Sequence, residues 1–339
     1  MKKIKAEEAV GTILAHDITR IIPGKFKGVA FKKGHVITGE DLPELLRLGK
    51  RYLYVLELRQ DQLHENEAAL RIAPAVSGPN LRWTEPAEGK SNIISLVTGL
   101  LKVNVEGLLR INKLENIIIS TLKTNFPCQK DQVVAATRII PLMISQKKIE
   151  KVESLARRFG PILQVLPYRR LRFGGVVTGS EIYQGLIKDE FDQYVAQKAL
   201  DYGCQYLKKI IVPDDAAAIS RAVLELKELG CDLILTTGGL SVDPDDVTRK
   251  GIRKAGARII SYGSPVLPGA MFLYARLGEI PILGLPACVY YYDTTVYDLF
   301  LPRVLAGEEI TKNDIAETGH GGLCLNCSNC RYPVCPFGK

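Results

Sequence analysis

The sequence predicts an α/β fold in which a mostly parallel sheet flanked by helices is preceded by smaller β-rich and α+β domains. From Leu171 onward, apolar runs of strand length alternate with amphipathic helical segments, the pattern of a parallel sheet covered on both faces. Before that point, short β-type runs surround fewer helical patterns. A stretch rich in Pro, Gly and Ser, residues 72–91, indicates a boundary within this earlier half.

These patterns divide the 339 residues into four parts. Within the first part we expect one helix, which Asp41 is placed to cap and Pro43 to begin. The predicted parts are a small β-rich domain at residues 1–75, an α+β domain at 85–165, the α/β domain at 168–310 and a cysteine-rich tail at 311–339.

The first half of the α/β domain follows a strand–helix–strand pattern. A buried strand at residues 172–179 is followed by a helix at 188–203, whose apolar side chains recur on one face, and by a strand at 206–212. The helix expected at 213–230 has Asp214 placed to cap its start and Gly230 placed to end it.

The second half continues the alternation and then reverses direction. A third strand at 231–239 leads to a short helix at 245–256 and a fourth strand at 257–263. Residues 271–286 read as a hairpin that turns at Gly278 and adds an antiparallel edge. A closing helix is expected at 287–305.

Composition is that of a globular protein, with 46% hydrophobic and 24% charged residues. Because no stretch reaches the roughly 18 uninterrupted apolar residues of a membrane span, we expect a cytoplasmic protein without a membrane partner. The net charge is +8, with a basic excess between Lys147 and Arg172. That excess indicates a solvated helix and linker or an anion-binding face, and we expect no nucleic-acid partner.

Polar loops follow four of the predicted strands of the α/β domain. They are residues 178–181, 212–215, 236–246 and 284–288. In an open parallel sheet, ligands bind beyond the carboxyl ends of the strands. Glycines let backbone N–H groups approach a phosphate, and hydroxyls add donors. Aspartates beside such a loop favour a divalent cation between them and the phosphate, although a plain polar turn is the alternative.

The strings "VVTGSE", "IVPDD" and "LTTGGLSVDPDDVT", with weaker support from "LPG" and "GLP", resemble a known family. Residues from about 172 to 307 are similar to the molybdopterin-binding domain shared by molybdopterin adenylyltransferase and molybdopterin molybdenumtransferase. The resemblance implies molybdopterin as substrate or ligand and Mg²⁺ as cofactor. It also implies a homo-oligomer that works with other molybdenum-cofactor assembly proteins or with a molybdoenzyme.

The same resemblance assigns roles to individual residues. The implied catalytic residues are Asp246, Asp245 and Asp189, and the implied Mg²⁺ ligands are Asp243 and Asp246. The residues implied to bind molybdopterin are Thr178, Gly179, Glu181, Thr237, Gly238, Gly239, Ser241, Pro268, Gly269, Gly284 and Pro286.

Two functions from different classes remain open at this point. The first is an enzyme that binds adenylated molybdopterin and inserts molybdate with Mg²⁺, which the complete string "GGLSVDPDDVT" favours. The second is a non-catalytic carrier or sensor of finished cofactor serving a molybdoenzyme. Glu190 and Phe191, which replace the family's Ser and Asn after Asp189, favour this second function. A nucleotide-processing enzyme on the same fold is a third alternative.

The tail contains four cysteines in a spacing typical of metal sites. They follow the pattern C-x2-C-x2-C-x4-C and a proline comes directly after the last. This is one residue longer than a ferredoxin spacing, so the tail predicts a four-iron four-sulfur cluster or a four-thiolate zinc site. The predicted ligands are Cys324, Cys327, Cys330 and Cys335.

Overall fold

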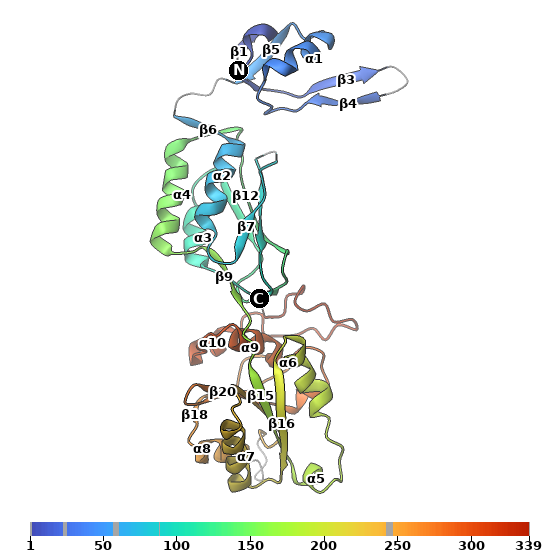
Figure 1. Ribbon diagram of the computed structural model, residues 1–339, viewed down its shortest axis with the longest axis vertical. Coiled ribbons are helices and arrows are strands. Elements are labelled where there is room, and N and C mark those ends of the chain that lie inside the picture. The colour runs from blue at the N-terminus through green and yellow to red at the C-terminus, as the bar shows by residue number, and fades with distance from the viewer. Residues whose placement is uncertain (1, 23–25, 57–60, 88, 242–246, 339) are drawn as a thin grey trace. The chain divides into compact units, whose positions relative to one another are not determined.

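The computed structural model describes residues 2–22, 26–56, 61–87, 89–241 and 247–338 (Figure 1). The chain forms two compact units. Unit 1 comprises Met1–Leu96, Lys102–Thr124 and Lys130–Val165. Unit 2 comprises Val97–Leu101, Asn125–Gln129 and Leu166–Lys339. Among the described helices, none is both long and apolar enough to span a membrane. The division into four parts stays a prediction.

Short strands and one helix form the beginning of unit 1. Their bounds are β1 Lys2–Lys5, η1 Ala6–Glu8, β2 Ile13–Leu14, β3 Ile18–Ile22, β4 Phe26–Phe31, η2 Gly39–Asp41, α1 Leu42–Arg47 and β5 Tyr52–Leu56. β1, β5 and β2 make an antiparallel sheet in that order, and β3 pairs with β4. Helix α1 begins directly after Asp41, as predicted, but the Asp41 carboxylate accepts from the Thr38 N–H instead of capping α1.

The rest of unit 1 is built on a four-stranded sheet of order β10-β12-β8-β7. Helix α2 packs against α4 and β12, and Arg71 of α2 forms an ion pair with Glu153 of α4 at 2.8 Å. The element bounds are β6 Gln62–His64, α2 Glu65–Val76, β7 Leu81–Trp83, β8 Ser91–Ser95, β9 Gly99–Val103, α3 Val105–Asn112, β10 Ile117–Thr121, β11 Phe126–Cys128, β12 Val133–Ile139, β13 Met143–Ser145, α4 Gln146–Phe159 and β14 Leu163–Pro167. β13 pairs with β6, and a further small sheet has the order β11-β9-β14.

Unit 2 is an α/β domain built on a six-stranded sheet of order β16-β15-β17-β20-β19-β18 (Figure 1). Its first four strands in that order are parallel to one another, which confirms the predicted α/β class with a parallel-containing sheet. The element bounds are β15 Arg172–Thr178, α5 Ser180–Tyr183, η3 Asp192–Ala196, α6 Gln197–Asp201, β16 Gln205–Val212, α7 Ala216–Glu228, β17 Leu233–Thr237, α8 Thr248–Lys254, β18 Arg258–Tyr262, β19 Leu273–Leu277, β20 Ile280–Leu285, η4 Ala287–Tyr290, α9 Val296–Leu305 and α10 Lys312–Glu317.

Alternating side chains bury both faces of this sheet. On β17, Leu233 and Leu235 belong to one core cluster and Ile234 to the other. The first cluster includes residues of η3, α6, α9 and α10, whereas the second includes residues of α7 and α8. Because successive residues of a strand point to opposite faces, an almost continuous apolar run is required for burial on both sides.

Three details of the predicted unit differ from the structure. Helix α7 is capped by Asp215, whose carboxylate accepts from the Ala218 N–H at 2.7 Å, and not by the adjacent Asp214. The hairpin β19–β20 does not form the edge, because β20 pairs with β17 and β18 lies outside β19. The expected closing helix at 287–305 is split into η4 and α9, which begins at a capping box formed by Thr295 and Asp298.

Candidate functional site

A cavity of about 520 Å³ lies beyond the carboxyl ends of β17 and β20 in unit 2. None of its described lining residues carries a charge. Six residues predicted to bind the cofactor line it, namely Gly238, Gly239, Ser241, Pro268, Gly269 and Pro286. The full lining consists of residues 238–241, 267–271 and 285–288 together with Tyr292, Leu323, Cys324 and Asn326.

The loop after β17 depends on its two glycines. Gly238 and Gly239 have φ values of 85° and 57°, in the left-handed region that glycine adopts readily. A Cβ on Gly238 would overlap the Thr178 carbonyl oxygen, and one on Gly239 would overlap the Thr248 hydroxyl. The loop therefore turns against the ends of β15 and α8 with no room for a side chain. This close approach leaves the backbone of the loop as the surface that a ligand meets.

Buried hydroxyls tie the loop to its surroundings. Thr178 Oγ1 lies 3.2 Å from the Thr237 carbonyl oxygen and 3.0 Å from Thr248 Oγ1. Thr248 in turn donates to the Gly238 carbonyl oxygen at 3.0 Å, and Tyr290 donates to Thr237 Oγ1 at 2.9 Å. Burial raises the pKa of Tyr290 to about 12, so its hydroxyl stays protonated at neutral pH. Thr178 and Thr237 thus shape the loop and are absent from the described cavity lining.

The second wall of the cavity is formed by residues 267–271. Gly269 has a φ of 139°, and a Cβ there would lie 2.5 Å from the Cβ of Val296. Ser264 Oγ donates to the Gly269 carbonyl oxygen at 2.9 Å, and the Val296 N–H donates to the Pro268 carbonyl oxygen at 3.1 Å. These bonds fix the wall to the start of α9. Gly284, in β20, packs its Cα side against Leu273 and does not line the cavity.

The first loop is held by a different contact. The Asp214 carboxylate accepts from both the N–H and the hydroxyl of Ser180, at 2.8 and 3.0 Å. This bond joins the loop after β15 to the loop after β16. Gly179 has a φ of 147°, and Glu181 is exposed. Neither residue belongs to the described lining of the cavity, so their predicted contact with the ligand remains a prediction.

Asp189 is engaged by a lysine. Its carboxylate forms an ion pair with Lys209 at 2.5 Å and accepts from the Phe191 N–H at 2.9 Å. Although burial opposes the charge, ion pairs with Asp189 and Asp192 raise the pKa of Lys209. Phe191 itself is completely buried in the first core cluster. The predicted catalytic Asp189 therefore sits in a salt-bridged network outside the described cavity lining.

The remaining predicted catalytic and Mg²⁺-binding residues, Asp243, Asp245 and Asp246, lie outside the described residues. The described part of the cavity lining supplies no carboxylate. Hard cations such as Mg²⁺ bind through carboxylates, and neutral hydroxyls or carbonyls alone do not make such a site. The described lining thus provides no cation site without these aspartates.

The tail contributes one wall of the cavity. The Leu267 N–H donates to the Gly322 carbonyl oxygen, and the Cys324 N–H donates to the Leu267 carbonyl oxygen, both at 2.8 Å. These bonds make a parallel bridge between Leu267 and Leu323. As a result, Leu323, Cys324 and Asn326 face the same space as the glycine loop.

A second cavity, of about 240 Å³, adjoins the tail. All four predicted metal ligands, Cys324, Cys327, Cys330 and Cys335, line it. Over the part of the chain that the structure describes, however, no three His, Cys, Asp or Glu side chains lie close enough together to hold one metal ion. The four thiols surround the space instead of meeting at a point.

Sequence reasoning missed several cavity residues. Met271, Cys288 and Tyr292 line the larger cavity without belonging to any predicted contact set. Burial raises the pKa of the Cys288 thiol to about 11, so it presents a neutral, polarisable group. The available signal was position, because these residues directly follow "LPG" and "GLP". Leu323 and Asn326 of the tail gave no such signal.

Two segments of the chain match known families. Residues 174–306 match the family described as "Probable molybdopterin binding domain", which confirms the resemblance seen in the loops. Residues 3–57 match a family described as a domain of unknown function. Unit 2 therefore carries a domain of the molybdopterin-binding type.

Individual relatives match over part of their length. A CinA-like protein of Amoebophilus asiaticus is 33% identical over 79 residues, which cover 23% of this chain and 19% of the relative. A molybdopterin molybdenumtransferase of Haemophilus influenzae is 26% identical over 151 residues, 42% of this chain and 37% of the relative. The crystal structure of the protein CinA with unknown function from Thermoplasma acidophilum has 19% identity and a TM-score of 0.33, covering 39% of this chain and 97% of that one.

Proposed function

We propose that unit 2 binds molybdopterin in the cavity of about 520 Å³ and that the chain acts in molybdenum-cofactor assembly. The observation that carries this proposal is the cavity itself. It gathers the glycine loop, Pro268, Gly269 and Pro286 at the carboxyl ends of parallel strands, within a domain of the molybdopterin-binding type.

The lining suits a planar ligand with a polar end. Leu240, Leu267, Met271 and Tyr292 offer apolar and aromatic surface for a ring system. Gly238 supports the other end, because a backbone without side chains lets N–H groups approach a phosphate. Since the described lining carries no charged side chain, the phosphate would be held by such dipoles and by the Ser241 hydroxyl.

In the enzymatic form of this proposal, the chain binds adenylated molybdopterin and inserts molybdate with release of AMP. Asp243 and Asp246 would hold Mg²⁺, with Asp245 and Asp189 as further catalytic carboxylates, as the family resemblance implies. Bound Mg²⁺ would polarise a phosphoryl oxygen. This chain's own described residues position the ligand, because the Thr178 and Thr248 hydroxyls fix the loop on which the phosphate rests.

A specific observation favours a second function, that of a carrier or sensor of finished cofactor. Asp189 is already paired with Lys209, and Phe191 fills the core where the transferase has a neutral polar residue. A salt-bridged carboxylate is a poor base, since its partner stabilises the charged form. Such a carrier would serve a molybdoenzyme or other assembly proteins, with a homo-oligomer as the expected assembly.

Single-turnover chemistry separates the two functions. The full chain would be incubated anaerobically with adenylated molybdopterin, Mg²⁺ and molybdate, and AMP would be followed for the wild type and for Asp246→Ala. We expect AMP release that requires molybdate and falls at least 100-fold in Asp246→Ala, because removing a metal-bound carboxylate removes transition-state stabilisation of several kcal/mol. The control is Glu228→Gln, which removes an exposed carboxylate on α7.

Each outcome has a distinct meaning. AMP release that survives Asp246→Ala would reject the assigned role of Asp246. Tight binding of molybdopterin without AMP release would reject the transferase and support the carrier. Absence of binding would reject the proposed function as a whole.

A further inference from the structure

The four cysteines of the tail come together around one space, although they are spread over twelve residues. Its other lining residues are mainly residues 291–294 and the aromatic side chains of Tyr332 and Phe337. The cavity has a volume of about 240 Å³. A structural zinc site does not fit this arrangement. With Zn–S bonds of about 2.3 Å, four thiolates would converge around a single point and leave no cavity.

A polynuclear cluster fits the same arrangement. In a four-iron four-sulfur cluster, each cysteine binds a different iron at a separate corner, so the thiolates stand around a volume. Here the four thiols line one volume, and no three of them converge on one point among the described residues. The lining also includes Arg331, whose positive charge is opposite to that of a cluster with four thiolates.

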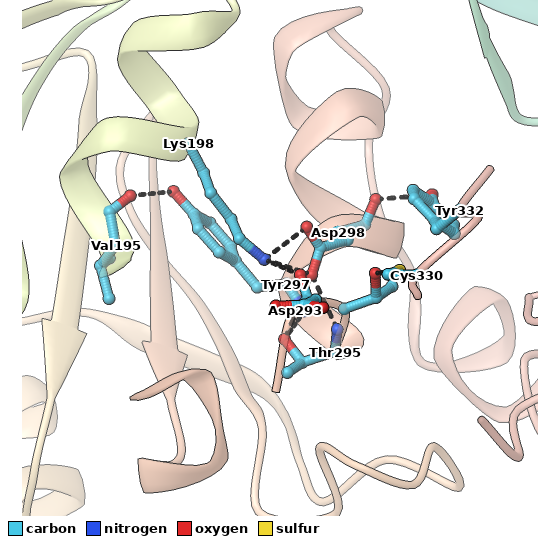
Figure 2. A network of polar contacts seen from close by, with 9 residues as sticks. Val195, Lys198, Asp293, Thr295, Tyr297, Asp298, Cys330 and Tyr332 are labelled. Carbon is cyan, nitrogen blue, oxygen red and sulfur yellow. Dashed lines mark hydrogen bonds and ion pairs between the residues drawn. The ribbon is translucent and has the colours of Figure 1, made fainter. Parts of the chain in front are cut away.

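Two of the sulfur atoms have hydrogen-bond partners of the kind that stabilise a thiolate. The Asn326 N–H donates to Cys324 Sγ at 3.5 Å. Thr294 Oγ1 lies 3.0 Å from Cys330 Sγ and can donate once the thiol is deprotonated (Figure 2). Hydrogen bonds from outside the ligand set orient metal ligands and stabilise their charged form.

The tail is held in place by the body of unit 2. Tyr332 donates to the Asp298 carbonyl oxygen at 2.9 Å, which fixes the tail to the first turn of α9 (Figure 2). Phe337 is 3% exposed and belongs to the first core cluster. The Gly338 N–H donates to the Gly321 carbonyl oxygen at 2.8 Å, so the two ends of the cysteine segment meet. The cysteines therefore occupy a closed loop with fixed ends.

The cysteine-lined cavity and the larger cavity share Tyr292, Cys324 and Asn326. Cys324 is joined to Leu267 by a backbone hydrogen bond, and Leu267 begins the second wall of the larger cavity. Anything that fixes the Cys324 sulfur therefore restrains this wall as well.

We infer that Cys324, Cys327, Cys330 and Cys335 hold a four-iron four-sulfur cluster whose binding orders the wall of the larger cavity through Cys324 and Leu267. The site is distinct from that of molybdopterin and does not depend on it. A ligand bound against Leu323 and Cys324 would lie next to the cluster-bearing loop.

The first test is the metal content of the full chain purified without oxygen. We expect about four iron and about four acid-labile sulfide per chain, with thiolate-to-iron absorption. Cys327→Ser and Cys330→Ser should each lower bound iron at least two-fold, and both side chains are exposed, so the fold should persist in circular dichroism. Ser328→Ala, at an exposed position between them, is the matched control and should keep its iron. One zinc per chain without sulfide, or iron retained in both cysteine variants, would overturn the inference.

The second test measures the link to the larger cavity without any ligand. Amide hydrogen exchange would be compared between the cluster-loaded chain and the same chain after removal of metal by a chelator. We expect exchange at Leu267 and Cys324 to be at least ten-fold slower in the loaded form, with Val223 of α7 unchanged as control. Equal rates at Leu267 and Cys324 would overturn the ordering of the wall. Because neither test uses molybdopterin, both stay decisive if the proposed function fails.

Discussion

Gly238 is the residue whose backbone geometry the candidate site requires most directly. Its φ of 85° is unfavourable for residues with a side chain, and its Cα hydrogen faces the Thr178 carbonyl oxygen, where a Cβ would overlap. The sequence pattern of two glycines after a buried strand predicted this loop. It could not predict which hydroxyls fix the loop, because Thr178 and Thr248 are 70 residues apart.

We therefore predict that Gly238→Ala weakens molybdopterin binding at least ten-fold and lowers the free energy of unfolding by about 1 to 3 kcal/mol. The added methyl group forces the loop away from Thr178, which displaces the backbone that supports the phosphate. Pterin fluorescence titration and urea denaturation would measure the two effects.

Gly278→Ala is the matched control, since Gly278 also has positive φ, at 59°, but faces open space in the turn between β19 and β20. It should cost about 1 kcal/mol of stability and leave affinity unchanged. Wild-type affinity in Gly238→Ala would show that the loop does not support the ligand.

At the scale of elements, a buried ion pair joins α6 to α9. Lys198 Nζ contacts the Asp298 carboxylate at 2.7 and 2.9 Å and donates to the Asp293 carbonyl oxygen at 2.7 Å (Figure 2). Asp298 also accepts from the Thr295 N–H at the start of α9. Burial raises the pKa of Asp298, and the charge of Lys198 opposes that rise. One carboxylate thus caps a helix and neutralises a lysine of the neighbouring helix.

We predict that Lys198→Met lowers the free energy of unfolding by about 2 to 3 kcal/mol, because it leaves the Asp298 carboxylate buried and unpaired. In an Asp298→Asn background, the same change should cost at least about 1 kcal/mol less, since no buried charge remains. Urea denaturation of the four proteins completes the double-mutant cycle.

The exposed ion pair between Lys208 and Glu225 provides the comparison, with about half of each side chain exposed. Lys208→Met should cost no more than about 1 kcal/mol, since water screens such pairs. If Lys198→Met cost no more than Lys208→Met, the pair would not stabilise the contact between α6 and α9.

Element types were predictable from the sequence to a greater extent than their partners. The periodicity of α7 and the apolar runs of β15 and β17 are local properties, so they predicted a helix and buried strands. Local pattern could not choose Asp215 over Asp214 as the cap, because both carboxylates precede the helix directly. Nor could it place β18 outside β19, since strand order depends on pairing between distant segments.

At the scale of the whole molecule, the resemblance predicted the site loops but gave no information on the tail. The bridge between Leu267 and Leu323 joins segments 56 positions apart, through backbone bonds that leave no mark in the sequence. The cysteine spacing predicted a metal, whereas the shared lining of two cavities became visible only in three dimensions.

The two compact units each have a core, and this has a consequence for unfolding. Ile72 of α2 and Leu235 of β17 are both completely buried, one in each unit. We predict that Ile72→Ala lowers the stability of unit 1, and Leu235→Ala that of unit 2, by about 2 to 5 kcal/mol each. Chains with several compact units commonly unfold in more than one step, so each change should act on its own unit.

Hydrogen exchange at increasing urea, read by mass spectrometry on peptides from α2 and β17, would measure both units in one sample. We expect Ile72→Ala to lower the urea midpoint of the α2 peptide and leave that of the β17 peptide within error, and Leu235→Ala to do the reverse. Equal shifts of both peptides in either variant would mean that the chain unfolds as a single cooperative structure. Because the candidate site and the cysteine tail both belong to unit 2, independent unfolding would also predict that Ile72→Ala retains molybdopterin binding.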